Sequence, residues 1–500
     1  MLNKLLTPKL IPLCGLGLLF TVGCGKQDLE PAANTSAGAR ATQELSTGPS
    51  LAKLQAQHYL IIATDRLPAD LAEQTKAAHG TVKAVLNAVG IATATSEDPG
   101  FAAKAARITG VRSVVRDFTY QGIDMNEERN AEVVTEADVV TETTQRNPFF
   151  RFQWGHTAIQ APQAWATGAQ GAGVVVADLD SGFDLTHPDL KGNIIGSKSF
   201  VAGEPWVQPK PGGSVHGTHT AGTIAAIDGG GGVVGVAPKA SLLLVKVLGD
   251  SGSGSFSGII EGIVYAADNN ADVINMSLGA ALPRNGRFLN DNNTPNDPSD
   301  DFIENDAKLV QEILVAINRA TAYAHKQGVT IIASAGNDAN DGNHDQSLVH
   351  IPADATGVIS ISATAPLGWA KAPETANLDR FASYSNYGTS AIDFAAPGGD
   401  GAYRPTTERI TFRGLNRPVR TFDFVLSTVT RGYAWLAGTS MAAPHVTGVA
   451  ALVIGQNGGA MDPTRVEAVL RASADDLGKP GRDELYGHGR VNALRAVQAH

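Results

Sequence analysis

Residues 173–177, Gly-Val-Val-Val-Ala, form the first of five short apolar runs in the C-terminal part of the chain. Helix-like stretches separate these runs, and the other four are residues 242–247, 272–276, 329–333 and 358–362. Continuous apolar strands that alternate with helices are typical of a parallel sheet covered on both faces. We therefore expect an α/β fold whose ligand site lies beyond the carboxyl ends of the strands.

Three polar blocks carry residue types suited to nucleophilic catalysis. Asp180-Ser-Gly follows the first strand, His216-Gly-Thr-His comes next, and Gly438-Thr-Ser-Met-Ala-Ala-Pro lies near the end. A serine hydroxyl is a poor nucleophile at neutral pH, so it needs an imidazole to take its proton and a carboxylate to orient that imidazole. The blocks resemble the Asp, His and Ser signatures of the subtilisin family, and they occur in that family's order.

The resemblance spans residues 152–496 and implies a subtilisin-like parallel sheet flanked by helices on both faces. It implies a serine endopeptidase that hydrolyses polypeptides through an acyl-enzyme, with Ser440 as nucleophile, His216 as base and Asp180 as orienting carboxylate. Asn337, which follows the fourth apolar run, is expected to donate a hydrogen bond to the developing oxyanion.

Two carboxylates near Asp180 and one histidine near His216 offer alternative interpretations of the site. Asp178 and Asp184 flank Asp180, but only Asp180 precedes the Ser-Gly that the family places after its catalytic aspartate. His219 lies three residues after His216, a spacing that a zinc site could use, yet no Asp or Glu pair accompanies it. We therefore expect no cofactor in catalysis.

The resemblance also implies two chain edges that bind a peptide backbone as an added β-strand. Their residues are Gly252, Ser253 and Gly254 on one edge, and Ser277, Leu278 and Gly279 on the other. The alternative is that both are ordinary Gly and Ser loops. A specificity pocket would lie between Leu278-Gly279 and residues 334–336, with His350 at its floor.

Two hypotheses from other classes remain open on the sequence alone. One is a catalytically inactive relative that acts as a surface binding module, although a scaffold has no need for all four site residues. The other is an esterase with the same triad, although the Gly-Ser-Gly and Ser-Leu-Gly edges suit a peptide backbone better.

The N-terminus has the layout of an export signal. Lys4 and Lys9 precede the apolar run 10–22, which is short for a membrane span, and we assign residues 1–24 to a signal peptide. Its ending resembles a bacterial lipobox, in which Cys24 becomes the lipidated first residue; the alternative is a plain secretory signal. Either way we expect an exported protein, extracellular or in the cell envelope, with membrane contact only through such an anchor.

The chain then divides into four further segments. Residues 25–56 have the composition of a flexible tether, and the order βαββαβ in residues 57–120 predicts a small ferredoxin-like α+β unit. This unit resembles the family's inhibitory propeptide. Residues 121–148 are expected to be an exposed acidic linker that holds the processing site, with self-cleavage between Asp124 and Arg151, and residues 149–500 form the peptidase domain.

Composition limits the remaining partners. Lys and Arg number 39 against 49 Asp and Glu, a net charge of -10, which argues against nucleic acid as a partner. The two cysteines, Cys14 and Cys24, both lie in the first segment, so the body has no thiol nucleophile. We expect a monomer and surface insertions at 281–305 and 399–430. The resemblance also implies a structural calcium ion with Asp189 at the position of one ligand, although the loop 228–232 lacks the Asn that the family has there.

Overall fold

The computed structural model of the protein describes residues 53–123, 125, 131–135, 147–290, 299 and 302–499, all within one unit that spans Pro49–His500. The predicted signal segment, Cys24, the tether up to residue 52 and most of the predicted processing segment lie outside the described residues. Within the described ranges, no helix is long and apolar enough to cross a membrane.

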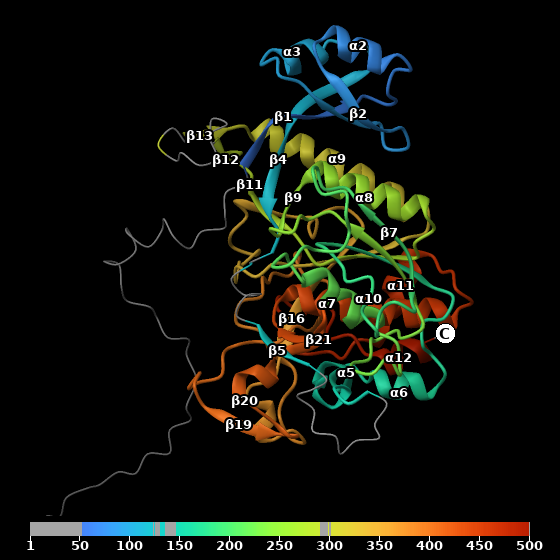
Figure 1. Ribbon diagram of the computed structural model, residues 1–500, viewed down its shortest axis with the longest axis vertical. Coiled ribbons are helices and arrows are strands. Elements are labelled where there is room, and N and C mark those ends of the chain that lie inside the picture. The colour runs from blue at the N-terminus through green and yellow to red at the C-terminus, as the bar shows by residue number, and fades with distance from the viewer. Residues whose placement is uncertain are drawn as a thin grey trace, which may run out of the picture. The chain divides into compact units, whose positions relative to one another are not determined.

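An eight-stranded sheet forms the centre of the C-terminal part (Figure 1). Its order is β17-β16-β14-β10-β6-β8-β7, with β18 also paired to β16, and all pairs are parallel except β16 with β17. The five apolar runs all form strands of this sheet, as predicted. The strands are β6 (Val175–Asp180), β7 (Ile194–Ser199), β8 (Ser241–Lys246), β10 (Val273–Met276), β14 (Thr330–Ser334), β16 (Val358–Ala365), β17 (Arg380–Phe381) and β18 (Phe394–Pro397).

Helices cover both faces of this sheet, as expected. Successive residues of β6 point to opposite faces: Val176 packs in one core with Ile224 and Val449, whereas Ala177 packs in a second core with Ile263 and Ile313. The first core lies under α7 and α10, and the second lies under α8 and α9. The helices are α7 (His216–Ala225), α8 (Phe256–Asp268), α9 (Ala307–Lys326) and α10 (Thr439–Gln456).

The N-terminal subdomain, residues 53–121, has its own antiparallel sheet in the order β4-β1-β3-β2. This order is the ferredoxin-like arrangement predicted from the sequence, although β1 begins four residues before the expected boundary at residue 57. Its elements are β1 (Lys53–Ala63), α2 (Leu71–Ala77), β2 (Thr81–Leu86), β3 (Ile91–Thr95), α3 (Phe101–Ala105) and β4 (Val111–Gln121).

The sheet of the N-terminal subdomain is covered on two sides by different parts of the chain. Ile61 packs with Phe101 in a small core against the subdomain's own helices. Leu60 and Ile62, which alternate with Ile61, pack in the core of α8 and α9 with Ile313. One apolar face of the subdomain is therefore buried by the larger sheet's helices.

The first insertion is less peripheral than expected. Residues 287–290 and 302–305 form a hairpin, β12 (Arg287–Asn290) with β13 (Phe302–Asn305), and β12 adjoins the first residue of β1. Phe288 is fully buried, with its ring centroid 5.1 Å from that of Phe118 in the N-terminal subdomain. The hairpin therefore contacts the subdomain rather than solvent alone.

The second insertion and the acidic linker also contribute to the interior. Residues 425–429 form β21 (Val425–Val429), which is buried throughout and pairs with β22 (Gly432–Leu436). The linker supplies β5 (Glu132–Val134), whose partner is β22 and whose Val134 is fully buried. The expectation of an exposed linker is wrong at Val134, whose burial depends on pairing with a strand about 300 residues later in the chain, whereas the neighbouring Val133 is 53% exposed.

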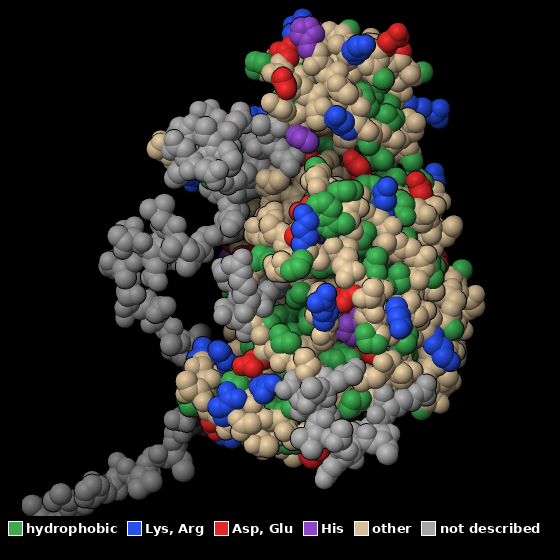
Figure 2. Space-filling model, viewed as in Figure 1, with side chains coloured by type: hydrophobic (Ala, Val, Ile, Leu, Met, Phe, Trp, Pro, Cys, Tyr) green, Lys and Arg blue, Asp and Glu red, His purple; other side chains and the backbone are tan. Residues whose placement is uncertain are grey.

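The surface drawn in Figure 2 has basic and acidic side chains interspersed over the N-terminal subdomain and the larger sheet's helices. Two hydrophobic side chains that are exposed belong to the hairpin strand β13: Phe302 is 48% exposed and Ile303 is 38% exposed.

Candidate active site

Asp180 and His216 form a buried pair at the carboxyl end of β6. Asp180 is the last residue of β6 and has no exposed surface, while His216 is the first residue of α7 and is 6% exposed. The imidazole Nδ1 lies 2.8 Å from Asp180 Oδ1 and 2.9 Å from Oδ2, and Ser181 N also donates to Oδ1. The carboxylate therefore holds Nδ1 as the protonated nitrogen of the neutral ring, which leaves the lone pair on Nε2.

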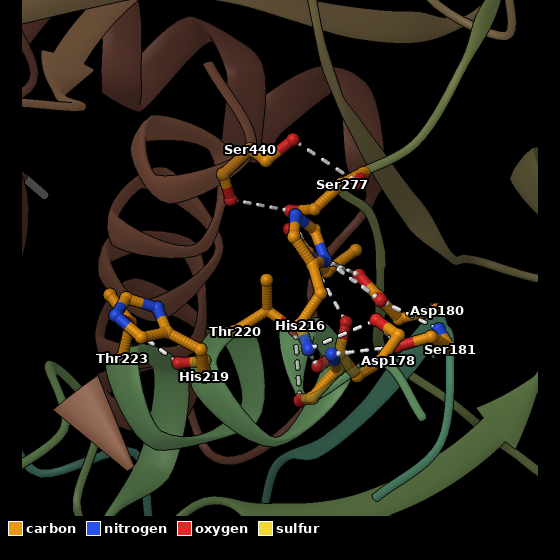
Figure 3. A network of polar contacts seen from close by, with 12 residues as sticks. Asp178, Asp180, Ser181, His216, His219, Thr220, Thr223, Ser277 and Ser440 are labelled. Atoms are coloured by element: carbon orange, nitrogen blue, oxygen red, sulfur yellow. Dashed lines mark hydrogen bonds and ion pairs between the residues drawn. The ribbon is translucent and has the colours of Figure 1, made fainter. Parts of the chain in front are cut away.

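Ser440 is the second residue of α10, so its backbone N–H belongs to the unpaired donors at the start of that helix. Ser440 Oγ donates to Ser277 O at 3.3 Å, and Ser277 Oγ donates to Ser440 O at 2.8 Å. Figure 3 shows the ring of His216 between Asp180 and this pair of serines. The three residues predicted from separate sequence blocks thus lie together.

The side-chain amide of Asn337 is held by the start of α10. Its Oδ1 accepts hydrogen bonds from Thr439 N at 2.9 Å and from Thr439 Oγ1 at 2.7 Å. Because both bonds use the oxygen, the amide nitrogen is left facing the backbone beside Ser440, and a Cβ at Gly438 would lie 3.4 Å from it. Asn337 follows β14, as predicted.

The loop after β6 is fastened to the start of α7. Ser181 Oγ accepts from Gly217 N at 3.1 Å and from Ser214 Oγ at 3.0 Å. A Cβ at Gly217 would lie 3.0 Å from Gly182 O and 3.1 Å from Ser181 O, so this approach of two backbones needs a glycine. The contact fixes the distance between the strand that carries Asp180 and the helix that carries His216.

The edge predicted at Gly252, Ser253 and Gly254 is paired with an extended strand. The end of β4 runs antiparallel to β9 (Ser253–Ser255), with Tyr120 opposite Gly254 and Gln121 opposite Ser253. Gly122 N donates to Gly252 O at 2.9 Å, and Gln121 Nε2 donates to Ser251 O at 3.0 Å. The C-terminal end of the N-terminal subdomain therefore lies along this edge as an added strand.

The second predicted edge leads directly away from Ser440. Ser277 exchanges hydrogen bonds with Ser440, Leu278 is 1% exposed, and Gly279 precedes β11 (Ala280–Pro283). A Cβ at Gly279 would lie 3.0 Å from Ile351 O, so the strand passes close to β15 (Leu348–Ile351).

The two other histidines singled out in the sequence have structural partners. His219 Nε2 lies 3.1 Å from both Val425 O and Ala434 O, and burial, with a smaller contribution from His216, lowers its pKa to about 3. His350 has Asn340 Oδ1 at 3.3 Å from Nε2 and Asn386 Nδ2 at 3.3 Å from Nδ1. It lines a cavity of about 350 Å³ together with Ala335, and its place at the floor of a specificity pocket stays a prediction.

Sequence reasoning treated Asp178 only as a residue to be distinguished from Asp180. In the structure its carboxyl group is fully buried and accepts from Asn275 Nδ2 and pairs with Thr220 Oγ1, both at 2.8 Å. Burial, followed by the charge of Asp180, raises the pKa of Asp178 to about 8. The two-residue spacing was the available signal, since alternate residues of a strand share a face.

The fold and these contacts define a class of protein. A carboxylate–imidazole pair beside a serine at a helix N-terminus, at the carboxyl end of a parallel sheet, is the arrangement of a serine hydrolase.

Comparison with known proteins identifies the family. The model of the subtilase family matches residues 171–489. Thermitase from Thermoactinomyces vulgaris is 34% identical over 358 residues, which are 71% of this chain and 99% of that protein. Subtilisin Savinase from Lederbergia lenta is 38% identical over 345 residues, which are 69% of this chain and 98% of that protein.

Solved structures show the same fold. The epidermin leader peptide processing serine protease from Staphylococcus aureus matches with a TM-score of 0.68 at 23% identity, covering 88% of this chain and 98% of that one. The chain belongs to the subtilase family and is a serine-type endopeptidase.

Proposed function

We propose that the protein hydrolyses peptide bonds through Asp180, His216 and Ser440. His216 Nε2 takes the Ser440 proton as Oγ attacks the scissile carbonyl, and the imidazolium then protonates the leaving amine. Water, deprotonated by the same imidazole, hydrolyses the acyl-enzyme. Asn337 Nδ2 and Ser440 N donate to the oxyanion in both steps. The observation that supports this most directly is the 2.8 Å contact of His216 with Asp180 beside Ser440.

The substrate in this proposal is a polypeptide bound in extended form. Gly252, Ser253 and Gly254 supply main-chain hydrogen bonds on one side, as they do for β4, and Ser277, Leu278 and Gly279 lie on the other.

The test combines a protein substrate with a serine-directed label. The mature enzyme should hydrolyse casein, a fluorophosphonate should label it and stop the reaction, and Ser440→Ala should lose both label and hydrolysis. Labelling without proteolysis would instead support the esterase reading. No labelling after removal of the N-terminal subdomain would support the inactive binding module.

We further propose that the chain is made as an inhibited precursor. The end of β4 occupies the edge that a substrate would use, so cleavage after it, between Asp124 and Arg151, would free the site. In this proposal the precursor is exported, with Cys24 as a lipid anchor or with a plain secretory signal, and the peptidase acts as a monomer outside the cytoplasm. Ser440→Ala should accumulate as the uncut precursor.

A structural calcium ion remains a proposal centred on Asp189. Its carboxyl group is fully buried, accepts from Val233 N at 3.0 Å, and lies against the loop at Gly230. The described residues contain no cluster of three His, Cys, Asp or Glu side chains that could hold a metal ion. Carboxylate and carbonyl oxygens are the ligands that calcium prefers, so Asp189 is a suitable donor. None of the catalytic steps proposed above involves the calcium ion.

A further inference from the structure

Asp178 and Asp180 place two carboxyl groups in the same dry region. Both side chains have no exposed surface and both belong to β6, two residues apart. Two buried negative charges at this separation repel each other strongly, and each also loses its hydration. Asp180 has the imidazole of His216 as a partner at 2.8 Å, so Asp178 is the carboxyl group for which a neutral form costs less.

The hydrogen bonds of Thr220 indicate where a proton on Asp178 lies. Thr220 Oγ1 is 2.8 Å from Asp178 Oδ2 and 3.0 Å from Gly217 O. A hydroxyl has one proton, so Thr220 cannot donate to both acceptors at full strength. If Asp178 Oδ2 carries a proton, it donates to Thr220 Oγ1, and Thr220 donates to Gly217 O. Both contacts are then complete hydrogen bonds.

The other oxygen of Asp178 leads to Ser440. Asn275 Nδ2 donates to Asp178 Oδ1 at 2.8 Å and to Ser277 Oγ at 3.1 Å, which uses both of its protons. Ser277 Oγ then donates to Ser440 O at 2.8 Å. Thr447 Oγ1 donates to Asn275 Oδ1 at 3.0 Å, so the amide is fixed in this orientation.

We propose that Asp178 is a neutral carboxylic acid that positions the three elements of the active site. Through Thr220, which bonds Gly217 O, it fixes the N-terminal part of α7, whose first residue is His216. Through Asn275 and Ser277 it fixes the start of α10, where Ser440 lies. Figure 3 shows Asp178, Thr220, Ser277 and Ser440 around His216. Asp180 follows it on β6, so the three predicted catalytic side chains share one hydrogen-bonded support. Asp178 is a positioning residue, and the inference rests on the catalytic roles proposed above.

The charged groups around Asp178 agree with a neutral form. Asp180 on β6 and His216 on α7 are the charged groups that act on it, and β10 and α10 present the uncharged Asn275 and Thr447. On β8, Lys246 lies opposite Asp180 in the strand register, but its ammonium pairs with Asp250 at 2.8 Å and Glu204 at 3.2 Å. The pKa of Asp178, which burial and the charge of Asp180 raise to about 8, also favours the neutral form at pH 7.

Conservative and disruptive substitutions test the proposal on the mature enzyme. In Asp178→Asn the side-chain oxygen still accepts from Asn275 and the amide still donates to Thr220, so kcat on a peptide anilide should stay within about threefold of wild type at pH 6.5–7.5. Asp178→Val with Thr220→Val removes the support but keeps the space filled, and kcat should fall about 10- to 100-fold with KM little changed. Fluorophosphonate titration counts the folded active sites in every sample.

The pH profile separates a positioning role from simple packing. Wild-type kcat should decline as pH rises through about 8, because ionised Asp178 can no longer donate to Thr220. Asp178→Asn should lack this decline. Asp184→Asn is the matched control. Asp184 is also a buried aspartate and lies shortly after β6, but its carboxylate accepts from Thr186 N and Arg431 N instead. This variant should keep the wild-type pH profile.

Two results would overturn the proposal. If Asp178→Asn loses as much kcat as the double Val variant, the carboxyl works in its ionised form. If the double Val variant keeps wild-type kcat, Asp178 positions nothing. Ser440→Ala is measured in parallel: hydrolysis that survives it would remove the proposed catalytic roles themselves, which is a different failure.

Discussion

At the scale of single residues, the side-chain amide of Asn337, the proposed oxyanion donor, is held in one orientation by Thr439. Thr439 uses its backbone N–H and its hydroxyl to bind Asn337 Oδ1, and Gly336 N donates to the same hydroxyl at 3.1 Å. Turning the amide over would break two hydrogen bonds at once. A donor fixed in this way needs no reorganisation when negative charge develops on the substrate, and that is the condition for strong electrostatic stabilisation.

Replacing Asn337 with Ala should therefore lower kcat far more than it changes KM. Loss of one such donor costs about 100- to 1,000-fold in kcat in a subtilisin, and we expect a loss of the same order here. Steady-state kinetics on a peptide anilide would measure it. Asn343→Ala is the control on the same loop, since Asn343 bonds Glu484 and Thr389 N instead. Equal effects of the two substitutions would contradict the assigned role.

At the scale of elements, the hairpin β12–β13 acts as part of the surface that holds the N-terminal subdomain. The Phe288 ring is packed against Phe118, which in turn lies 4.5 Å from Phe256 of α8 between ring centroids. At the edge of this cluster, Glu304 of β13 forms an ion pair with Arg116 of β4. Most of the attraction comes from the buried rings, because a partly exposed ion pair contributes little.

Phe288→Ala should weaken the binding of the subdomain after the self-cleavage proposed above. Removing a buried ring from this interface should weaken retention of the cut subdomain by about 10- to 100-fold, measured by gel filtration of the processed protein over a dilution series. Phe302→Ala provides the control from the same hairpin, because Phe302 is 48% exposed. Unchanged retention in Phe288→Ala would show that the hairpin is not part of the holding surface.

The same elements show what the sequence could and could not predict. Strands β6 and β14 were predictable because their apolar runs are continuous; Asp180 was picked out by the Ser-Gly that follows it, and Asn337 by its position shortly after β14. Phe288 gave no signal, since it is a single aromatic residue in an Asn-rich and Asp-rich insertion whose partner lies 170 residues earlier. Asp178 likewise gained its meaning only from Thr220 and Asn275, which are brought to it by tertiary packing.

At the scale of the whole molecule, the sheet of the N-terminal subdomain lies between the subdomain's own helices and two helices of the large sheet, α8 and α9. Leu60 and Ile62 are buried only because α8 and α9 cover them. Glu312 of α9 also binds across this contact, accepting from Ser113 Oγ at 2.7 Å and pairing with Arg112 at 3.2 Å. The buried contact places the end of β4 along β9, so a retained subdomain also covers the edge proposed to bind substrate.

The buried carboxyl group of Asp117 should make this retention dependent on pH. Its carboxyl group is buried at the start of α8, and burial raises its pKa from 3.8 to about 6, against hydrogen bonds from Ser257 and the backbone of Phe118 and Phe256 that lower it. The docked state therefore binds the proton more tightly than the released subdomain does. Its stabilisation is complete below about pH 4 and is lost as pH rises through about 6.

The cut subdomain should therefore leave more readily at neutral pH than in acid. A shift of about two pKa units corresponds to about 100-fold in the dissociation constant between pH 4 and pH 7, and gel filtration of the processed protein at each pH would measure it. The comparison that isolates Asp117 is Asp117→Asn, which has no proton to lose and should show a flatter profile than wild type. Two results would rule out Asp117 as the group responsible. One is an identical pH profile for wild type and Asp117→Asn. The other is a ratio of wild-type to Asp117→Asn affinity that is higher at pH 7 than at pH 4.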